Sequence, residues 1–177
     1  FLGTLVPLKG AHILLGAWEA LDPDLRARGT LTLCGPTEHA PGYAQDLRRR
    51  ASAVGAHLEG ALARDEVAAA LAATDLLVVP SLWFENRPLV VLEALAARVP
   101  LLVSDLGGMA ELVEEGVAGW RVTPGDVGAM AQRLAALLDD PSPLDRLSFE
   151  VDELLPSWDD LAGSVMAQYD ELLGLRR

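Results

Sequence analysis

The chain has 177 residues, of which 51% are hydrophobic and 23% charged, a composition typical of a folded globular domain rather than a disordered chain. Its formal net charge of −12 argues against nonspecific binding to nucleic acid or to an anionic membrane. No apolar run is long enough to cross a bilayer, and the single cysteine, Cys34, allows no internal disulfide. These features indicate a reducing, cytoplasmic location.

Short apolar runs alternate with longer segments of helical periodicity. In chain order, the pattern predicts strand 1–5, helix 9–21, strand 31–34, helix 43–54, strand 57–60, helix 64–73, strand 76–80, helix 88–97, strand 101–104, helix 107–114, strand 119–122, helix 126–138 and a last helix 157–173. Asp126 and Ser157 are the expected N-caps of the last two helices.

This alternation predicts an α/β fold: one Rossmann-like, doubly wound parallel sheet of about six strands, with helices on both faces. No linker or repeat divides the chain, so a single domain over residues 1–177 is expected. Ligands of such sheets lie beyond the carboxyl ends of the strands. The loops at 3–9, 35–42, 80–87 and 105–108 are therefore the candidate binding region.

The helix predicted at 88–97 carries the clearest chemical signal. Pro88 suits its first position, which would leave the backbone N–H groups of the next three residues, 89–91, free to bind an anion. Glu93 is the only charged residue in this helix, which indicates burial beside a cavity; a solvated glutamate on a half-exposed helix is the alternative. With Glu85 just before the helix, two carboxylates would flank a positive helix end. This arrangement suits the hydroxyls and diphosphate of a nucleotide sugar.

Glu85 and Glu93 also match the E-x7-E motif of the retaining family 4 glycosyltransferases, which have two Rossmann-like domains in the GT-B fold. Residues 1–10 (FLGTLVPLKG) resemble the family's G-R-L-x-x-x-K-G opening, and residues 72–81 (AATDLLVVPS) its A-D-x-x-x-x-P-S strand. Residues 99–113 (VPLLVSDLGGMAELV) resemble its P-V-V-x-x-D-x-G-G-x-x-E-x-V segment. The spacings 116–119 (GVAG) and 124–126 (PGD) match as well. The resemblance covers nearly the whole chain.

The resemblance implies a donor-binding domain, with Glu85 and Lys9 as the catalytic residues. Glu93 would accept hydrogen bonds from the ribose, Glu85 would contact the transferred sugar, and Lys9, the only lysine in the chain, would pair with the diphosphate. The implied donor-binding residues are Gly3, Lys9, Gly35, His57, Leu58, Glu85, Asn86, Arg87, Pro88, Leu89, Val90 and Glu93. Neither a metal nor another cofactor is implied, because the nucleotide diphosphate sugar is itself the substrate.

One position departs from the family pattern: Thr4 stands where the family has an arginine after the first glycine. Half of the expected phosphate clamp is therefore absent, and Arg87, at the mouth of the anion-binding helix, is a candidate to replace it. Weak donor binding or lost activity is the other interpretation of Thr4.

The resemblance also implies a partner, the N-terminal GT-B domain of the same polypeptide, which would hold the acceptor. The helix at 157–173 would return towards that domain, and without it the chain alone would have little activity and is open to self-association. Peripheral attachment at the inner face of the membrane, through the other domain, stays an alternative to a purely cytoplasmic location. Two alternative functions stay open: a GT-B nucleotide-sugar epimerase, and a non-enzymatic nucleotide- or partner-binding Rossmann-like module.

Overall fold

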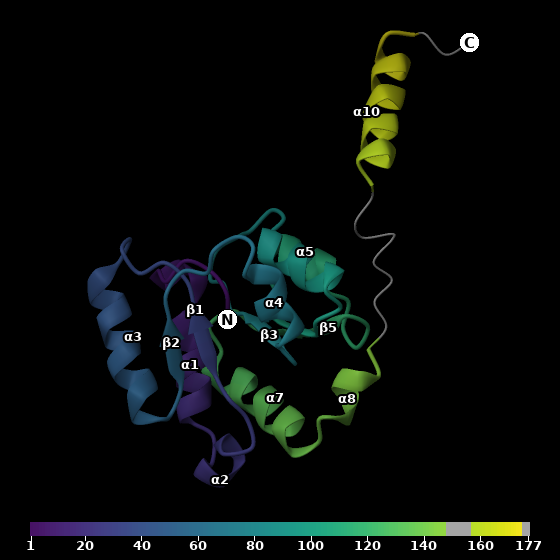
Figure 1. The fold of residues 1–177 in the computed structure, drawn as a ribbon. Coiled ribbons are helices and arrows are strands. Elements are labelled where there is room, and N and C mark those ends of the chain that lie inside the picture. The colour runs from purple at the N-terminus through teal and green to yellow at the C-terminus, as the bar shows by residue number, and fades with distance from the viewer. Residues whose placement is uncertain (148–156, 175–177) are drawn as a thin grey trace.

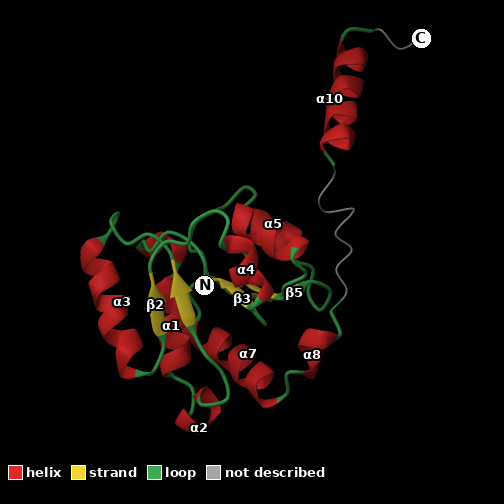
Figure 2. Ribbon diagram, in the orientation of Figure 1, coloured by secondary structure: helices red, strands yellow, loops and turns green. Residues whose placement is uncertain are grey.

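The computed structural model describes residues 1–147 and 157–174. Its strands are β1 (Thr32–Cys34), β2 (His57–Glu59), β3 (Leu77–Val79), β4 (Leu101–Ser104) and β5 (Gly119–Val122). All strand pairs are parallel, with β1 beside β2 and with β4 between β3 and β5. The helices up to residue 145 lie around these strands (Figures 1 and 2).

The helices follow the predicted order. They are the 3₁₀ helix η1 (Pro7–Lys9) and the α-helices α1 (Ala11–Glu19), α2 (Pro23–Arg26), α3 (Pro41–Ala53), α4 (Val67–Ala72), α5 (Leu89–Ala96), α6 (Gly107–Leu112), α7 (Val127–Asp139), α8 (Ser142–Asp145) and α10 (Trp158–Leu172). None of them, within the described part of the chain, is long and apolar enough to cross a membrane.

Alternating strand residues contribute to two separate apolar clusters, as the two-residue period of a strand requires. Leu77 and Val79 of β3 pack with residues of α4, α5 and α6, whereas Val78 packs with residues of α1, α3 and α7. In β4, Leu101 belongs to the cluster of Leu77 and Val79, whereas Leu102 belongs to the cluster of Val78. Helices therefore cover both faces, which confirms the predicted Rossmann-like α/β class.

The prediction of one sheet with about six strands is wrong in its first strand. Residues 1–5 form only a single parallel bridge, from Leu2 to Cys34, together with hydrogen bonds from Gly3 N to Cys34 O and from Leu5 N to Pro36 O. Cys34 N also donates to Phe1 O, but the ladder cannot continue in full because Pro36 has no N–H to donate to Gly3 O. The described strands accordingly form a two-stranded and a three-stranded group.

Several helix boundaries also differ from the prediction. Residues 7–9 form the turn η1, and α1 begins only after Gly10, whose positive φ of 72° ends that turn. α3 begins at Pro41 and α4 at Val67, because Pro41 fixes a helical φ and residues 64–66 form a turn instead. Pro88 is the N-cap of α5 rather than its first residue.

Two predicted N-caps are confirmed. The Asp126 side chain accepts a hydrogen bond from Ala129 N, and Ser157 forms a capping box with Asp160. The helix that Ser157 begins, α10, lies apart from the α/β body (Figure 1). Its apolar side chains are exposed: Leu161, Val165, Met166, Tyr169 and Leu172.

The loop between β3 and α5 touches backbone on both of its sides. A Cβ added to Gly10 would lie 1.8 Å from Pro80 O, and one added to Gly108 would lie 1.6 Å from Asn86 O. Hydrogen bonds accompany both contacts, from Leu82 N to Leu8 O at 2.8 Å and from Gly108 N to Glu85 O at 2.7 Å. The loop is therefore held between η1 and the start of α6.

A polar contact joins the first turns of α1 and α3. Tyr43 Oη accepts a hydrogen bond from His12 N at 3.0 Å and lies 2.9 Å from His12 Nδ1. If Tyr43 donates its hydroxyl proton to Nδ1, the imidazole is neutral. Burial, and then the charge of Arg50, lower the pKa of His12 below its usual 6.5.

This contact predicts a pH-dependent loss of stability. Because the pKa of His12 is lower in the folded than in the unfolded chain, its contribution is complete above pH 6.5 and is lost as the pH falls through the folded value. We expect the free energy of unfolding to decrease below pH 6.5 more steeply for the native chain than for His12→Gln. Urea unfolding of both proteins at a series of pH values measures the difference, and parallel curves would contradict the prediction.

The close contact at Gly108 predicts a specific intolerance of side chains. Gly108→Ala must displace the 85–87 loop, and we expect it to lower the free energy of unfolding by about 1–3 kcal/mol. Gly42, also the second residue of a helix, has nothing within 4 Å of an added Cβ. Gly42→Ala is thus the matched control, with no loss of stability expected in the same urea titration. Equal effects of the two substitutions would contradict the interpretation.

Candidate functional site

The two predicted catalytic residues, 76 positions apart, form a direct ion pair. Lys9 Nζ lies 2.5 Å from Glu85 Oε1. Lys9 is the last residue of η1, and Glu85 lies in the loop after β3, so the contact of this loop with η1 brings them together. The Glu85 side chain is 15% exposed and that of Lys9 37% exposed. The pair is thus partly shielded yet accessible from one side.

Ser81 is a further member of this cluster, which we call the Lys9–Glu85 cluster and which consists of Lys9, Ser81 and Glu85. Its side chain is fully buried, and its Oγ lies 3.1 Å from Glu85 Oε1 and 3.3 Å from Leu8 O. The hydroxyl can donate its proton to either acceptor, which fixes the carboxylate beside Lys9. The sequence showed Ser81 only as part of the P-S pair after a buried strand, without this role.

The start of α5 differs in two respects from the prediction. Glu93 is exposed rather than buried, because the helix buries only the stripe Val91, Ala94 and Leu95. The amide of Val91 is not free, since it donates to Pro88 O at 3.0 Å. The amides of Leu89 and Val90 have no hydrogen-bond partner among the described residues. These two N–H groups are the ones left for an anion.

The other predicted donor residues lie around these elements. Asn86 and Arg87 are exposed in the loop before α5, and Pro88 is buried at its end. Gly3 N donates to Cys34 O, and Gly35 N donates to Gly60 O, each at 3.0 Å, so Gly3 and Gly35 come from adjacent segments. The four loops predicted as the binding region therefore touch one another. Loop 3–9 contacts loops 35–42 and 80–87, and loop 80–87 also contacts loop 105–108.

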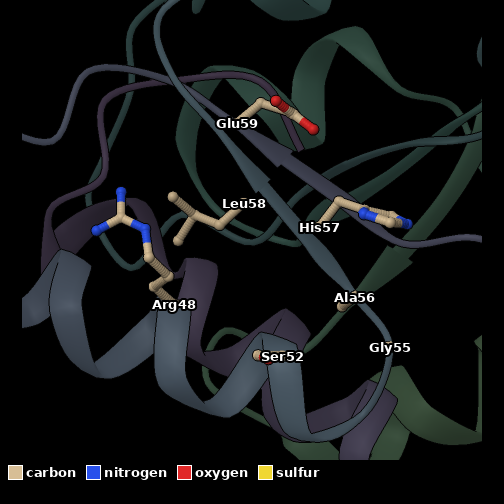
Figure 3. Close-up of a pocket in the computed structure, with 7 residues that line it drawn as sticks. All are labelled: Arg48, Ser52, Gly55, Ala56, His57, Leu58 and Glu59. Carbon is tan, nitrogen blue, oxygen red and sulfur yellow. The ribbon is translucent and has the colours of Figure 1, made fainter.

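His57 and Leu58 line a different feature, an open hollow of about 370 Å³ between β2 and α3. Its other lining residues are Arg48, Ser52, Gly55, Ala56 and Glu59 (Figure 3). No residue of the Lys9–Glu85 cluster lines this hollow, and neither does Glu93. The structure thus brings Lys9 and Glu85 together but does not join His57 and Leu58 to them.

Exposed apolar side chains lie next in sequence to the Lys9–Glu85 cluster and at the start of α5. Trp83 is 58% exposed, Phe84 71%, and Leu8 and Leu89 are also exposed. Phe84 lies beside the start of α6, where its Cδ1 is 3.4 Å from the position of a Cβ on Gly107.

Chemically, the site combines a primary ammonium, a carboxylate that the ammonium holds in place, and a helix start with two unsatisfied amides. Such groups can bind a ligand that carries both phosphate and hydroxyls. Within the described residues, no group of three or more His, Cys, Asp or Glu side chains is placed to hold a metal ion.

Known proteins resemble this chain along most of its length. Glycogen synthase of Mycobacterium tuberculosis is 31% identical over 175 residues, which cover 96% of this chain and 41% of that protein. The MMP alpha-(1->4)-mannosyltransferase of Mycolicibacterium hassiacum is 32% identical over 179 residues, which cover 95% of this chain and 41% of that protein. The chain thus spans less than half the length of these relatives.

Solved structures agree on the fold. HepE of Anabaena in complex with UDP-glucose superposes with a TM-score of 0.75 and 24% identity, over 94% of this chain and 48% of that chain. Sucrose-phosphate synthase of Thermosynechococcus elongatus gives a TM-score of 0.78 with 24% identity, over 98% and 45%. The sequence itself matches the family "Glycosyl transferases group 1" over residues 1–140. The chain therefore belongs to the group 1 glycosyl transferases.

Proposed function

We propose that this chain is the donor-binding domain of a retaining, family 4 glycosyltransferase that moves a sugar from a nucleotide diphosphate sugar to an acceptor. The observation that carries the proposal is the contact of Lys9 with Glu85 beside the start of α5. The relatives named for sugar transfer and the UDP-glucose complex of HepE support the same ligand class.

Each part of the donor has a counterpart in this arrangement. The diphosphate would lie at the amides of Leu89 and Val90, within reach of Lys9, whose charge would stabilise the leaving group as the bond to the anomeric carbon breaks. Glu85 would accept hydrogen bonds from the transferred sugar, and the exposed Glu93 from the ribose. Gly3 would let the first loop approach the donor, and Gly35 would border the base together with His57 and Leu58, which line the hollow beside β2.

The acceptor site would lie in the rest of the polypeptide, in an N-terminal GT-B domain. The exposed apolar stripe of α10 is a suitable surface for contact with that domain. We propose that the enzyme is cytoplasmic. It is either free or attached peripherally to the inner face of the membrane through that domain.

Donor binding is expected to stabilise the chain and to depend on Lys9. At a ligand concentration 100-fold above Kd, stabilisation would be about 2.7 kcal/mol. Thermal melting with UDP, GDP and ADP sugars should therefore show an increase in Tm for at least one donor. Lys9→Ala should abolish this shift, whereas Asp46→Ala, in the middle of α3, should leave it in place.

Flat melting curves across the panel would contradict the donor site. They would favour the second candidate, a non-enzymatic Rossmann-like module that binds a partner other than a nucleotide sugar. A nucleotide-sugar epimerase would also give a shift, but it would convert the donor sugar without an acceptor, which product analysis with the full polypeptide detects.

Arg87 is the candidate to supply the positive charge that is missing because Thr4 stands where the family has an arginine. Arg87 lies one residue before the N-cap of α5, at the proposed diphosphate position. If it supplies the missing charge, Arg87→Ala should weaken donor binding about tenfold or more, while Arg87→Lys retains most of it. Isothermal titration with the donor found in the melting screen measures both. An unchanged Kd for Arg87→Ala would exclude this role.

A further inference from the structure

The hydroxyl of Tyr43 joins the first turns of α1 and α3. Tyr43 Oη accepts the backbone N–H of His12 at 3.0 Å, and it lies 2.9 Å from His12 Nδ1. Because the oxygen already accepts a proton from His12 N, its own proton is available to Nδ1, which can accept it only when the imidazole is neutral. The two rings meet edge to face, with centroids 5.6 Å apart. We call this arrangement the His12–Tyr43 tether.

The tether lies at the ends of loops 3–9 and 35–42 of the candidate site, because its two residues follow these loops in the chain. Near the start of the second loop, Pro36 O accepts a hydrogen bond from Leu5 N at 3.0 Å. The second loop is therefore held to the segment of Lys9 twice, once at its start and once just after its end.

A further polar contact keeps the rest of α3 on α1. Arg50 donates to both carboxylate oxygens of Glu19, from Nε at 2.9 Å and from Nη2 at 2.7 Å. Leu47, which lies between Tyr43 and Arg50 in the chain, is fully buried. Loss of the tether would therefore release the first turn of α3 and the loop before it without detaching the helix.

We propose that Tyr43 is a positioning residue for the donor site, which together with neutral His12 keeps loop 35–42 beside the loop of Lys9. The inference rests on the proposed function, because it concerns the same donor. Gly35 would border the base and Lys9 would pair with the diphosphate, so the two loops must keep a fixed separation to bind both parts of one molecule. Loops that are already held in place lose less conformational entropy when the donor binds.

Protonation of His12 would weaken the tether. An imidazolium would direct a second N–H at Tyr43 Oη and would leave the hydroxyl proton without its acceptor. It would also face the positive charge of Arg50 on α3, whereas α7 meets α1 through apolar side chains such as Val127. Burial and the charge of Arg50 hold the pKa of His12 below its usual 6.5, so the imidazole is neutral at about pH 7.5 and becomes charged only at lower pH.

Donor binding as a function of pH tests the inference. UDP-glucose, GDP-mannose and ADP-glucose are the probes, and their diphosphate, esterified at both ends, keeps its charge over the range. Tyr43→Phe cannot form the tether, and its Kd by isothermal titration should be raised about fivefold at pH ~7.5 and should not depend on pH. The Kd of the native chain should increase towards that value as the pH falls below the pKa of His12.

Two matched variants complete the test. Tyr169→Phe removes the hydroxyl of the second tyrosine in the chain, which is exposed on α10, and it should bind the donor as the native chain does. His12→Asn places an amide oxygen near the position of Nδ1, and this acceptor does not titrate. It should therefore retain the native Kd at pH ~7.5 and lose the pH dependence.

The outcomes separate the positioning role from the donor site. A native Kd with native pH dependence in Tyr43→Phe would exclude the positioning role and leave the donor site in place. A raised Kd that still depends on pH in this variant would also overturn the inference, because His12 would then act without Tyr43. If none of the three donors binds the native chain at pH ~7.5, the donor site itself fails, and the positioning role fails with it.

Discussion

The position of the site depends on two places where the backbone of the loop after β3 touches other backbone without an intervening side chain. At Gly10 and at Gly108, the loop after β3 comes so close that even a methyl group would not fit. These contacts hold the loop between η1 and α6, and they decide where Glu85 lies. The ion pair of Glu85 with Lys9 and its contact with the buried hydroxyl of Ser81 both depend on that position.

The fold was largely predictable because the strands β3 and β4 are short runs of Leu and Val that bury both faces. Such runs leave little doubt about the class of fold. The first strand failed because a local apolar pattern does not show whether a partner strand continues beside it. Residues 1–5 run beside residues 32–36, but only the bridge at Leu2 is complete, because Pro36 has no N–H for the next one.

The sequence singled out candidate residues for the site but did not show how they lie relative to one another. Lys9 and Glu85 stood out separately, one as the only lysine and one by its motif, yet nothing local in the sequence shows that they touch across 76 positions. For Glu93, in contrast, the sequence predicted the wrong environment, burial instead of exposure. Its helix is apolar in composition, but Leu89, Val90 and Leu92 remain partly or fully exposed, so composition overstated how much of the helix is buried.

The direct pairing of Lys9 with Glu85 has a consequence for selectivity. The ammonium is already compensated by a carboxylate, so an anion that offers charge alone must compete with Glu85 for it and gains little. A ligand that also presents hydroxyls can bind the Lys9 ammonium through its phosphate and the Glu85 carboxylate through its hydroxyls, so neither group of the pair loses a partner. If the site binds a donor as proposed, it would therefore favour a diphosphate that still carries its sugar over one that has lost it.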